Sequence, residues 1–126
     1  MRARLALLQS GTRVELREVV LRDKPEAFLA VSLSATVPCL ETTDGVIDES
    51  IDIMHWALRQ HDPQQWLDMP EAGERWIARC DGPFKHALDR TKYATRYPEE
   101  DAEAHRAEAH AFLAELDGAL TPWIFE

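Results

Sequence analysis

The sequence predicts a mixed α/β region followed by an all-helical region, and three observations support this prediction. First, a Thr-Asp-Gly turn at residues 43–45 separates two short apolar runs, at residues 37–40 and 46–47. Asp-Gly between apolar runs is the strongest short-range signal for a β-hairpin. Second, residues 50–60 carry apolar side chains at helical spacing directly after the hairpin. Third, only helical patterns occur from Asp68 onward.

The N-terminal region is predicted to hold two helices and a strand before the hairpin. Residues 2–9 form the first helix, which Gly11 ends in the manner of a left-handed glycine cap. Residues 13–20 alternate partly between polar and apolar side chains and are expected to form a strand. Pro25 lies in the first turn of a short helix over residues 27–31. The expected buried residues are Leu5 and Leu8, with Ala3 and Leu7 beside them, in the first helix, and Ile51, Met54, Ala57 and Leu58 after the hairpin.

Three helices are expected in the C-terminal region. The first covers residues 70–79, and the Asp-Gly-Pro sequence at residues 81–83 is expected to break it before a second helix at residues 84–93. Pro98 and the acids after it predict the start of a third helix. The expected core residues are Trp76 and Ile77, then Phe84, Ala87, Leu88 and Thr91, then Ala109, Phe112, Leu113, Leu116 and Leu120.

Length and composition indicate one globular domain or two small ones. The chain has 126 residues, of which 45% are hydrophobic and 29% charged, so it can bury a modest core. Its net charge of −9 opposes binding to nucleic acid or anionic membranes, although the first 24 residues are locally basic and suit a small anionic ligand. No apolar run approaches the ~20 residues of a membrane span, and the N-terminus does not resemble a signal peptide.

The two cysteines, Cys39 and Cys80, are best interpreted as reduced, packed thiols of a cytosolic protein. Cys39 lies close to where a bound thiol would sit and could form a mixed disulfide, but it has no second cysteine or cation beside it, so packing is favoured. No metal is expected. His105, Glu108 and His110 crowd one helix, yet the spacing of the histidines places them on different faces, which favours solvated surface.

The junction between the hairpin and the next helix is a candidate ligand site. Asp48, Glu49 and Ser50 lie where the second strand ends and the helix begins. The free N–H groups of the helix start, its dipole and the Ser50 hydroxyl suit a carboxylate, while Glu49 suits an ammonium group. An amino-acid head group carries both charges. The alternative interpretation is an N-cap pair that only supports the helix, and both interpretations are compatible.

Pro38 is the second candidate feature. A proline at the start of a strand cannot donate a ladder hydrogen bond. A cis Val37–Pro38 bond costs only about 0.5–1 kcal/mol relative to trans and would leave the Val37 N–H and C=O free to pair with a peptide-like ligand. The alternative is an ordinary trans proline at a strand edge.

Together, the Thr36-Val37-Pro38 sequence, the hairpin, the Asp48-Glu49-Ser50 sequence and the apolar helix resemble the glutathione-binding half of the glutathione S-transferases. The resemblance implies an α/β thioredoxin-like domain over residues 1–64, lacking the usual first strand, and an all-α helical segment over residues 68–126. It also implies that both domains are incomplete, with a linker at residues 62–67.

The resemblance further implies how glutathione would be held. Val37, beside Pro38, would bind the cysteinyl backbone through its main chain, and Glu49 and Ser50 would bind the γ-glutamyl end. Ser34 and Ala35 stand where the family often has Lys-Gly, so Ser34 would offer the glycyl carboxylate a hydrogen bond without a charge. The implied partners are glutathione as co-substrate, with an electrophile or disulfide, in a cytoplasmic homodimer.

The family's catalytic serine, cysteine or tyrosine normally follows a strand that precedes the first helix, and no residue of this sequence matches it. The chain is therefore expected to be a fragment, truncated at both ends, in which residues 13–20 lack their partner strand. The leading hypothesis is a glutathione-binding, transferase-like protein that in a complete form conjugates glutathione to electrophiles or reduces disulfides. The alternative is a non-catalytic glutathione-binding or protein-interaction module of the same fold. A glutaredoxin-like oxidoreductase is disfavoured because no N-terminal cysteine motif is present.

Overall fold

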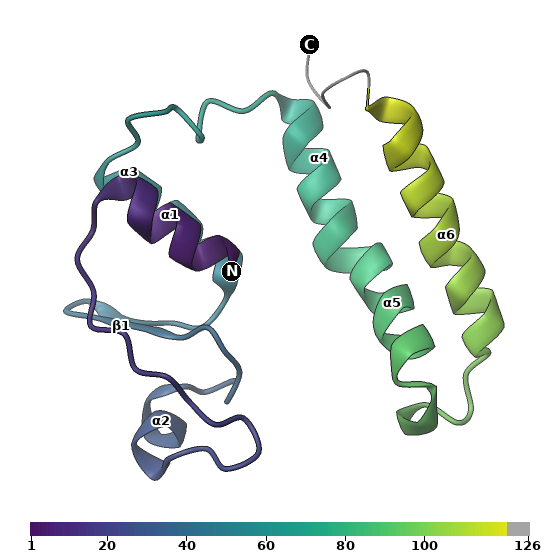
Figure 1. Ribbon diagram of the computed structural model, residues 1–126, viewed down its shortest axis with the longest axis horizontal. Helices are drawn as coiled ribbons and strands as arrows, with labels where there is room; N and C mark the ends of the chain where they lie inside the picture. Colours follow the sequence, from purple (N-terminus) through teal and green to yellow (C-terminus); the bar gives the residue numbers. More distant parts are fainter. Residues whose placement is uncertain (121–126) are drawn as a thin grey trace. The chain divides into compact units, whose positions relative to one another are not determined.

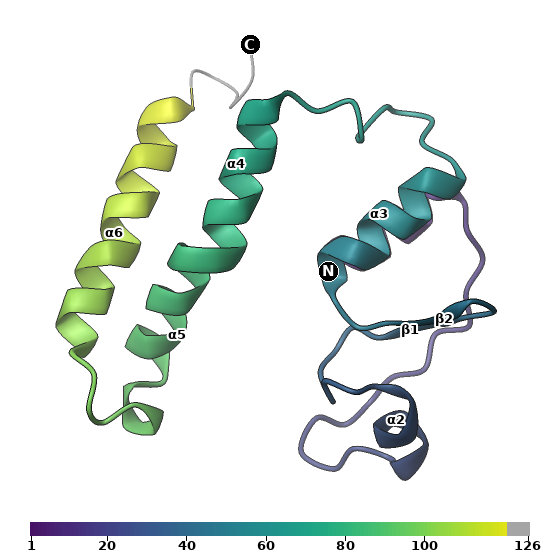
Figure 2. The same cartoon turned by 180° about the vertical axis from the view of Figure 1, so that it is seen from behind.

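The computed structural model describes residues 1–120 and divides the chain into two compact units, Met1–Asp68 and Met69–Glu126. Figures 1 and 2 show the first unit as a small α/β assembly and the second as a pair of antiparallel helical arms. The division follows the change from mixed to purely helical patterns in the sequence. Each unit is described separately below.

The first unit contains three helices and one hairpin. The elements are α1 (Arg2–Ser10), α2 (Glu26–Val31), β1 (Leu40–Thr42), β2 (Gly45–Ile47) and α3 (Ser50–Gln60). The strands pair antiparallel in the register Leu40–Ile47, Glu41–Val46 and Thr42–Gly45. Helices α1 and α3 pack side by side (Figures 1 and 2). The hairpin and the bounds of α3 are confirmed, although β1 begins at Leu40 rather than at residue 37.

The buried face of α1 agrees with the prediction only in part, because Ala3 is buried as expected but Leu5 and Leu8 are not. Leu5 and Leu8 are 49% and 79% exposed, whereas Ala3 and Ala6 are buried. Ala6 packs with Ala57 and Leu58 of α3. Small side chains let the two helices approach closely, so the alanine face is the one that packs. In α3 the structure also buries Ile53, which the predicted stripe omitted, while Ile51 and Met54 are only half-buried.

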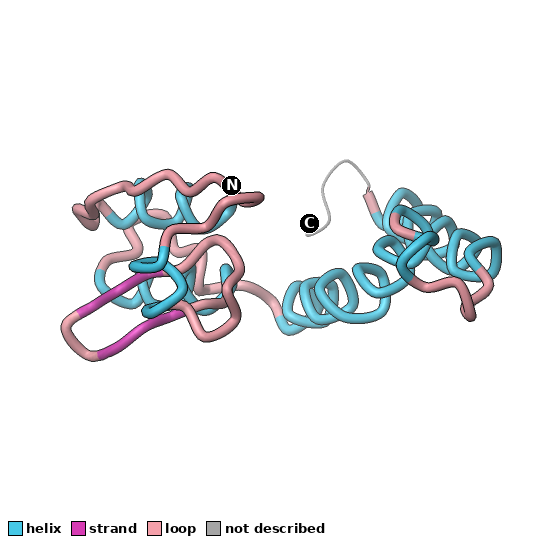
Figure 3. The backbone as a smooth tube through the Cα atoms, turned by 90° about the horizontal axis from the view of Figure 1, so that it is seen from below, coloured by secondary structure: helices cyan, strands magenta, loops and turns pink. Residues whose placement is uncertain are grey.

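The predicted strand at residues 13–20 is wrong. This segment leaves α1 as irregular chain, and residues 13–18 are all exposed (Figure 3 draws it as loop). Strands need a hydrogen-bonded neighbour, and β1 and β2 pair only with each other among the described residues. The segment therefore forms no strand, although its polar and apolar side chains alternate in part.

The second unit is built from two helical arms. The first consists of α4 (Glu71–Arg79), the π turn η1 (Cys80–Phe84) and α5 (Lys85–Lys92), and the second is α6 (Ala102–Ala119), with the short 3-10 turn η2 (Ala94–Arg96) between them. The predicted break at residues 81–83 is wrong, because the helix continues through Pro83. A proline cannot donate the α-helical hydrogen bond, and the wider π turn accommodates it.

Helix α6 begins later than Pro98. Asp101 is its N-cap, and its carboxylate accepts hydrogen bonds from the N–H groups of Glu103 and Ala104 at 3.0 and 3.2 Å. Only part of the predicted stripe is buried: Ala109 and Phe112 are buried, Leu116 is half-buried, and Leu113 and Leu120 are exposed. A pair of helical arms has a single buried seam, which explains why the outer leucines remain at the surface.

Phe112 is the centre of the contact between the arms. Its ring stacks on Phe84 at a centroid distance of 4.7 Å and meets Trp76 edge-on at 5.8 Å. Beside it, the Arg79 guanidinium donates to both Glu115 carboxylate oxygens, at 2.6 and 2.5 Å, and this hydrogen bonding lowers the pKa of Glu115. None of the helices within residues 1–120 is both long and apolar enough to cross a membrane.

Candidate functional site

The candidate site consists of two segments that Asp48 joins, namely the loop of residues 32–39 and the junction between β2 and α3. Asp48 accepts a hydrogen bond from the Ser32 hydroxyl through Oδ1 at 2.8 Å and from the Ser34 backbone N–H through Oδ2 at 3.1 Å. Since Glu49 and Ser50 follow Asp48 directly, these bonds bring Ser34 beside the start of α3.

The hydrogen bonds at Asp48 favour its charged form. The Ser34 backbone N–H and then the Ser32 hydroxyl lower the pKa of the Asp48 carboxyl, because both groups donate to the carboxylate. Ser32 is only 2% exposed and its N–H also caps α2 by donating to Phe28. The sequence analysis missed Ser32, and it missed that Asp48 joins the two segments of the site by hydrogen bonds. An aspartate after a strand and a serine after a helix are too common to signal their pairing.

Ser34 lies at the surface of the site, and its hydroxyl already has local partners. It is 2.7 Å from the Thr36 hydroxyl and accepts from the Thr36 backbone N–H at 3.2 Å. The next residue, Ala35, has a φ of +52°, in the left-handed region that favours glycine. This conformation turns the loop from Ser34 toward Val37.

The Val37–Pro38 peptide bond is cis. Val37 is 47% exposed, and its N–H and C=O form no hydrogen bond with any residue of 1–120. Pro38 is half-buried. An exposed residue with both main-chain groups unpaired can pair with another extended backbone, as a neighbouring strand would.

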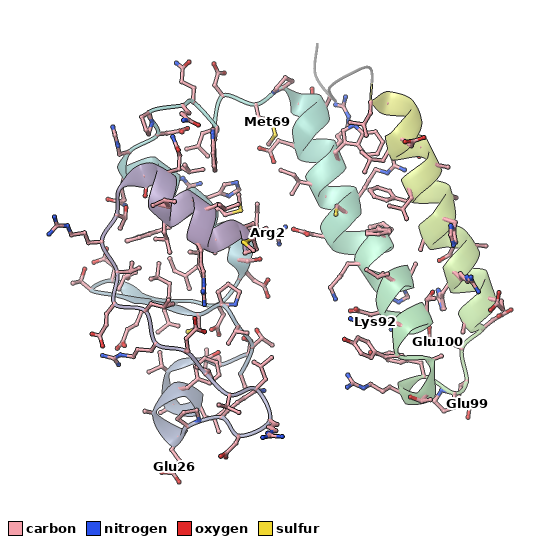
Figure 4. All side chains as sticks on the ribbon, viewed as in Figure 1. Arg2, Glu26, Met69, Lys92, Glu99 and Glu100 are labelled. Atoms are coloured by element: carbon pink, nitrogen blue, oxygen red, sulfur yellow. The ribbon has the colours of Figure 1, made fainter. Side chains whose placement is uncertain are left out.

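Glu49 and Ser50 differ in their surroundings. Glu49 occupies the N-cap position of α3 with φ −91° and ψ 133°, as the capping interpretation expected, but its side chain makes no capping hydrogen bond. The Glu49 carboxylate is exposed and has no partner within residues 1–120. The Ser50 hydroxyl accepts a hydrogen bond from Nε of Arg2 at 2.9 Å (Arg2 is labelled in Figure 4).

Arg2 is a further site residue that the sequence analysis did not find. It lies in the first turn of α1, and the packing of α1 against α3 brings its guanidinium to Ser50. The site therefore contains an exposed carboxylate, a hydroxyl held by a cation, and the N-terminus of α3. In the sequence, only the basic character of the first 24 residues indicated a cation near the ligand site.

The two cysteines have different environments. Cys39 is half-buried, and burial followed by its hydrogen bond to Asp48 raises the pKa of the thiol to about 11. It therefore stays protonated near neutral pH, which agrees with a packing role. Cys80 is exposed on the π turn, so the expectation that both thiols are packed is wrong for Cys80. Both cysteines are free.

No group of three or more histidine, cysteine, aspartate or glutamate side chains within residues 1–120 could hold a metal ion. The His105 ring is not solvated surface, since its side chain is only 17% exposed. Its Nε2 lies 2.8 Å from Glu100 and its Nδ1 3.3 Å from Glu108, and its ring meets that of His86. These contacts stabilise the start of α6 in the second unit.

The first unit combines a helix, a β-hairpin preceded by a cis-proline, and a helix whose N-terminus faces a polar site. These features define a thioredoxin-like N-terminal domain. A family model described as "Glutathione S-transferase, N-terminal domain" matches residues 1–66. The chain therefore belongs to the glutathione S-transferase family, with a mostly helical remainder after this domain. Comparisons with curated proteins and with solved structures found no match.

Proposed function

We propose that the first unit binds glutathione at the site formed by Ser34, Val37, Pro38, Glu49 and Ser50. The observation that carries the proposal is the state of Val37, a 47% exposed residue beside the cis peptide bond whose N–H and C=O form no hydrogen bond with any residue of 1–120. The cysteinyl residue of glutathione has the complementary N–H and C=O. Two main-chain hydrogen bonds would hold it as a strand holds its neighbour.

The γ-glutamyl end of glutathione matches the charges at the start of α3. The Glu49 carboxylate is exposed and unpaired within residues 1–120, so it can accept the α-ammonium group. The Ser50 hydroxyl, the first N–H groups of α3 and the Arg2 guanidinium together suit the α-carboxylate. Ser34 would meet the glycyl carboxylate with a hydrogen bond but without a charge, which favours moderate affinity.

We propose that the chemistry is that of a transferase acting on glutathione in the cytoplasm, with an electrophile or a disulfide as the second substrate. The second candidate is a non-catalytic glutathione-binding module. The environment of Cys39 favours this candidate, because burial and Asp48 raise the pKa of its thiol to about 11 and leave little thiolate to act as a nucleophile.

Titration calorimetry with glutathione tests the binding site. The unmodified protein should bind, and Glu49→Gln should weaken binding by roughly 10- to 100-fold, the usual effect of losing a charge-assisted hydrogen bond. Glu41→Gln removes an exposed carboxylate of β1 and is the matched control, which should bind normally. Cysteinylglycine, which lacks the γ-glutamyl group, should be insensitive to Glu49→Gln. Equal affinities of the unmodified protein and Glu49→Gln for glutathione would refute the assignment of Glu49.

A conjugation assay separates the two candidate functions. Formation of a glutathione conjugate with a model electrophile, lost together with binding in a Glu49→Gln and Ser50→Ala double variant, selects the transferase. Binding without conjugation selects the non-catalytic module. Absence of glutathione binding by the unmodified protein would contradict both.

A further inference from the structure

The Asp48 carboxylate accepts hydrogen bonds from both ends of the loop that carries Val37. Before Val37 in the chain, the Ser32 hydroxyl donates to Oδ1 at 2.8 Å and the Ser34 backbone N–H donates to Oδ2 at 3.1 Å. After Val37, the Cys39 thiol also forms a hydrogen bond with the carboxylate. One side chain therefore restrains the loop on both sides of Val37.

The loop needs a restraint from outside itself. Ala35 has a φ of +52°, and a residue with a side chain keeps such a conformation only where the surrounding structure fixes it. Within residues 1–120, the hydrogen bonds of Thr36 go to the Ser34 hydroxyl, so they stay inside the loop. Asp48 lies between β2 and the N-cap of α3, so its bonds connect the loop to the start of α3.

We propose that Asp48 is a positioning residue for glutathione, which holds the two parts of the binding site at the separation that one tripeptide can bridge. This rests on the proposed function, in which Val37 pairs with the cysteinyl backbone and Glu49 binds the α-ammonium group. Asp48 directly precedes Glu49 and restrains Val37 from both sides, so it sets the distance between the two contacts. A ligand that makes both contacts gains affinity, because the second contact forms at a high effective concentration once the first is made.

This role differs from general stabilisation of the fold in its effect on ligands of different length. Cysteinylglycine reaches only the part of the site at Val37. Glutamine, the γ-amide of glutamate, reaches only the part at Glu49. Neither fragment depends on the distance between the two parts, so loss of the Asp48 bonds should weaken glutathione selectively. A loss of folded protein would instead weaken all three ligands alike.

NMR titrations of the full chain with glutathione, cysteinylglycine and glutamine test the proposal. Asp48→Asn keeps the size of the side chain but removes its charge and one of its two acceptor oxygens. It should weaken glutathione by about tenfold and each fragment by less than about twofold. The matched control is Asp44→Asn, the same change at an exposed position of the hairpin turn, which should bind all three ligands normally.

Substitutions of Cys39 test the restraint on the other side of Val37. Cys39→Ala removes a donor to Asp48 and should weaken glutathione selectively, whereas Cys39→Ser keeps a donor and should restore the affinity. Hydrogen exchange of the ligand-free protein checks the contact itself. The Ser34 N–H should exchange faster in Asp48→Asn, while unchanged rates in α1 and α3 show that the variant is folded.

The outcomes separate this role from the proposed function. Equal weakening of all three ligands, a glutathione affinity that Asp48→Asn leaves unchanged, or an unchanged exchange rate at Ser34 would overturn the role of Asp48 while the binding site stands. Absence of glutathione binding by the unmodified protein would overturn the proposed function, and the role of Asp48 with it.

Discussion

Replacing Ala35 by glycine should stabilise the first unit. Ala35 has a φ of +52° in the loop that carries Ser34 and Val37. An alanine in the left-handed region costs roughly 1–2 kcal/mol relative to the right-handed region, and glycine avoids this cost. Glycine loses more conformational entropy on folding, by about 0.4–1 kcal/mol. The expected balance is a gain of about 0.5–1 kcal/mol in the free energy of unfolding for Ala35→Gly.

Urea denaturation followed by tryptophan fluorescence, to which Trp56 and Trp66 of the first unit contribute, measures this change. The matched control is Ala30→Gly, which makes the same substitution at an exposed position of α2, in the same unit. In a helix the substitution should cost about 1 kcal/mol, so the two variants should move in opposite directions. If Ala35→Gly lost as much stability as Ala30→Gly, the left-handed assignment of Ala35 would be refuted.

Three further predictions concern the thiols, an acid and a helix cap. At pH 8, iodoacetamide should modify the exposed Cys80 well before Cys39. A pKa of about 11 leaves Cys39 with roughly 100-fold less thiolate than its ordinary pKa of 9.0 would. Mass spectrometry of a timed reaction measures the order, and earlier modification of Cys39 would contradict the prediction. Folding lowers the pKa of Asp48, so its contribution to stability is present above pH 3.8, its ordinary pKa, and is lost as the pH falls through the lower folded pKa. The urea midpoints of the unmodified protein and Asp48→Asn should therefore converge on acidification. A difference that stays constant with pH would count against the hydrogen bonds of Asp48 to Ser32 and Ser34. Asp101→Ala should reduce the free energy of unfolding of the second unit by about 1 kcal/mol, because α6 loses its N-cap. Asp101→Asn should keep most of this stability, since asparagine also caps helices. Equal losses in the two variants would argue against capping by Asp101.

The elements with local signals were predictable. The Asp-Gly turn and the apolar spacing after it predicted the hairpin and the bounds of α3, Ser50–Gln60, because turn chemistry and helical periodicity are written in adjacent residues. Helix α1 was predictable in extent, but its buried face only in part, since Ala3 was expected there whereas Ala6 was not, and Leu5 and Leu8 lie exposed. Leucines are more apolar than alanines, yet close approach of α1 to α3 selects Ala3 and Ala6.

The missed strand and the missed site residues share one physical cause, which is dependence on a distant partner. Residues 13–20 have a strand-like pattern but no neighbouring strand among the described residues. In the candidate site, the motif between Val37 and Ser50 is enough to predict a ligand site, and that site stays a prediction. Its internal contacts were not predictable, because Asp48 pairs with Ser32 and Arg2 with Ser50 across 16 and 48 positions. No local pattern encodes such pairs, because each partner alone is an ordinary polar residue.

The π turn at Cys80–Phe84 sets the angular phase between the two halves of its helical arm. Phe84 follows Trp76 by eight positions, which in an uninterrupted α-helix would separate the two rings by roughly 80° around the axis. The wider turn absorbs about one residue of rotation and brings them back to within roughly 20°. Both rings can then contact the Phe112 ring from the same face of the first arm. The π turn that contains Pro83 thus keeps Trp76 and Phe84 on the same face of the helical arm.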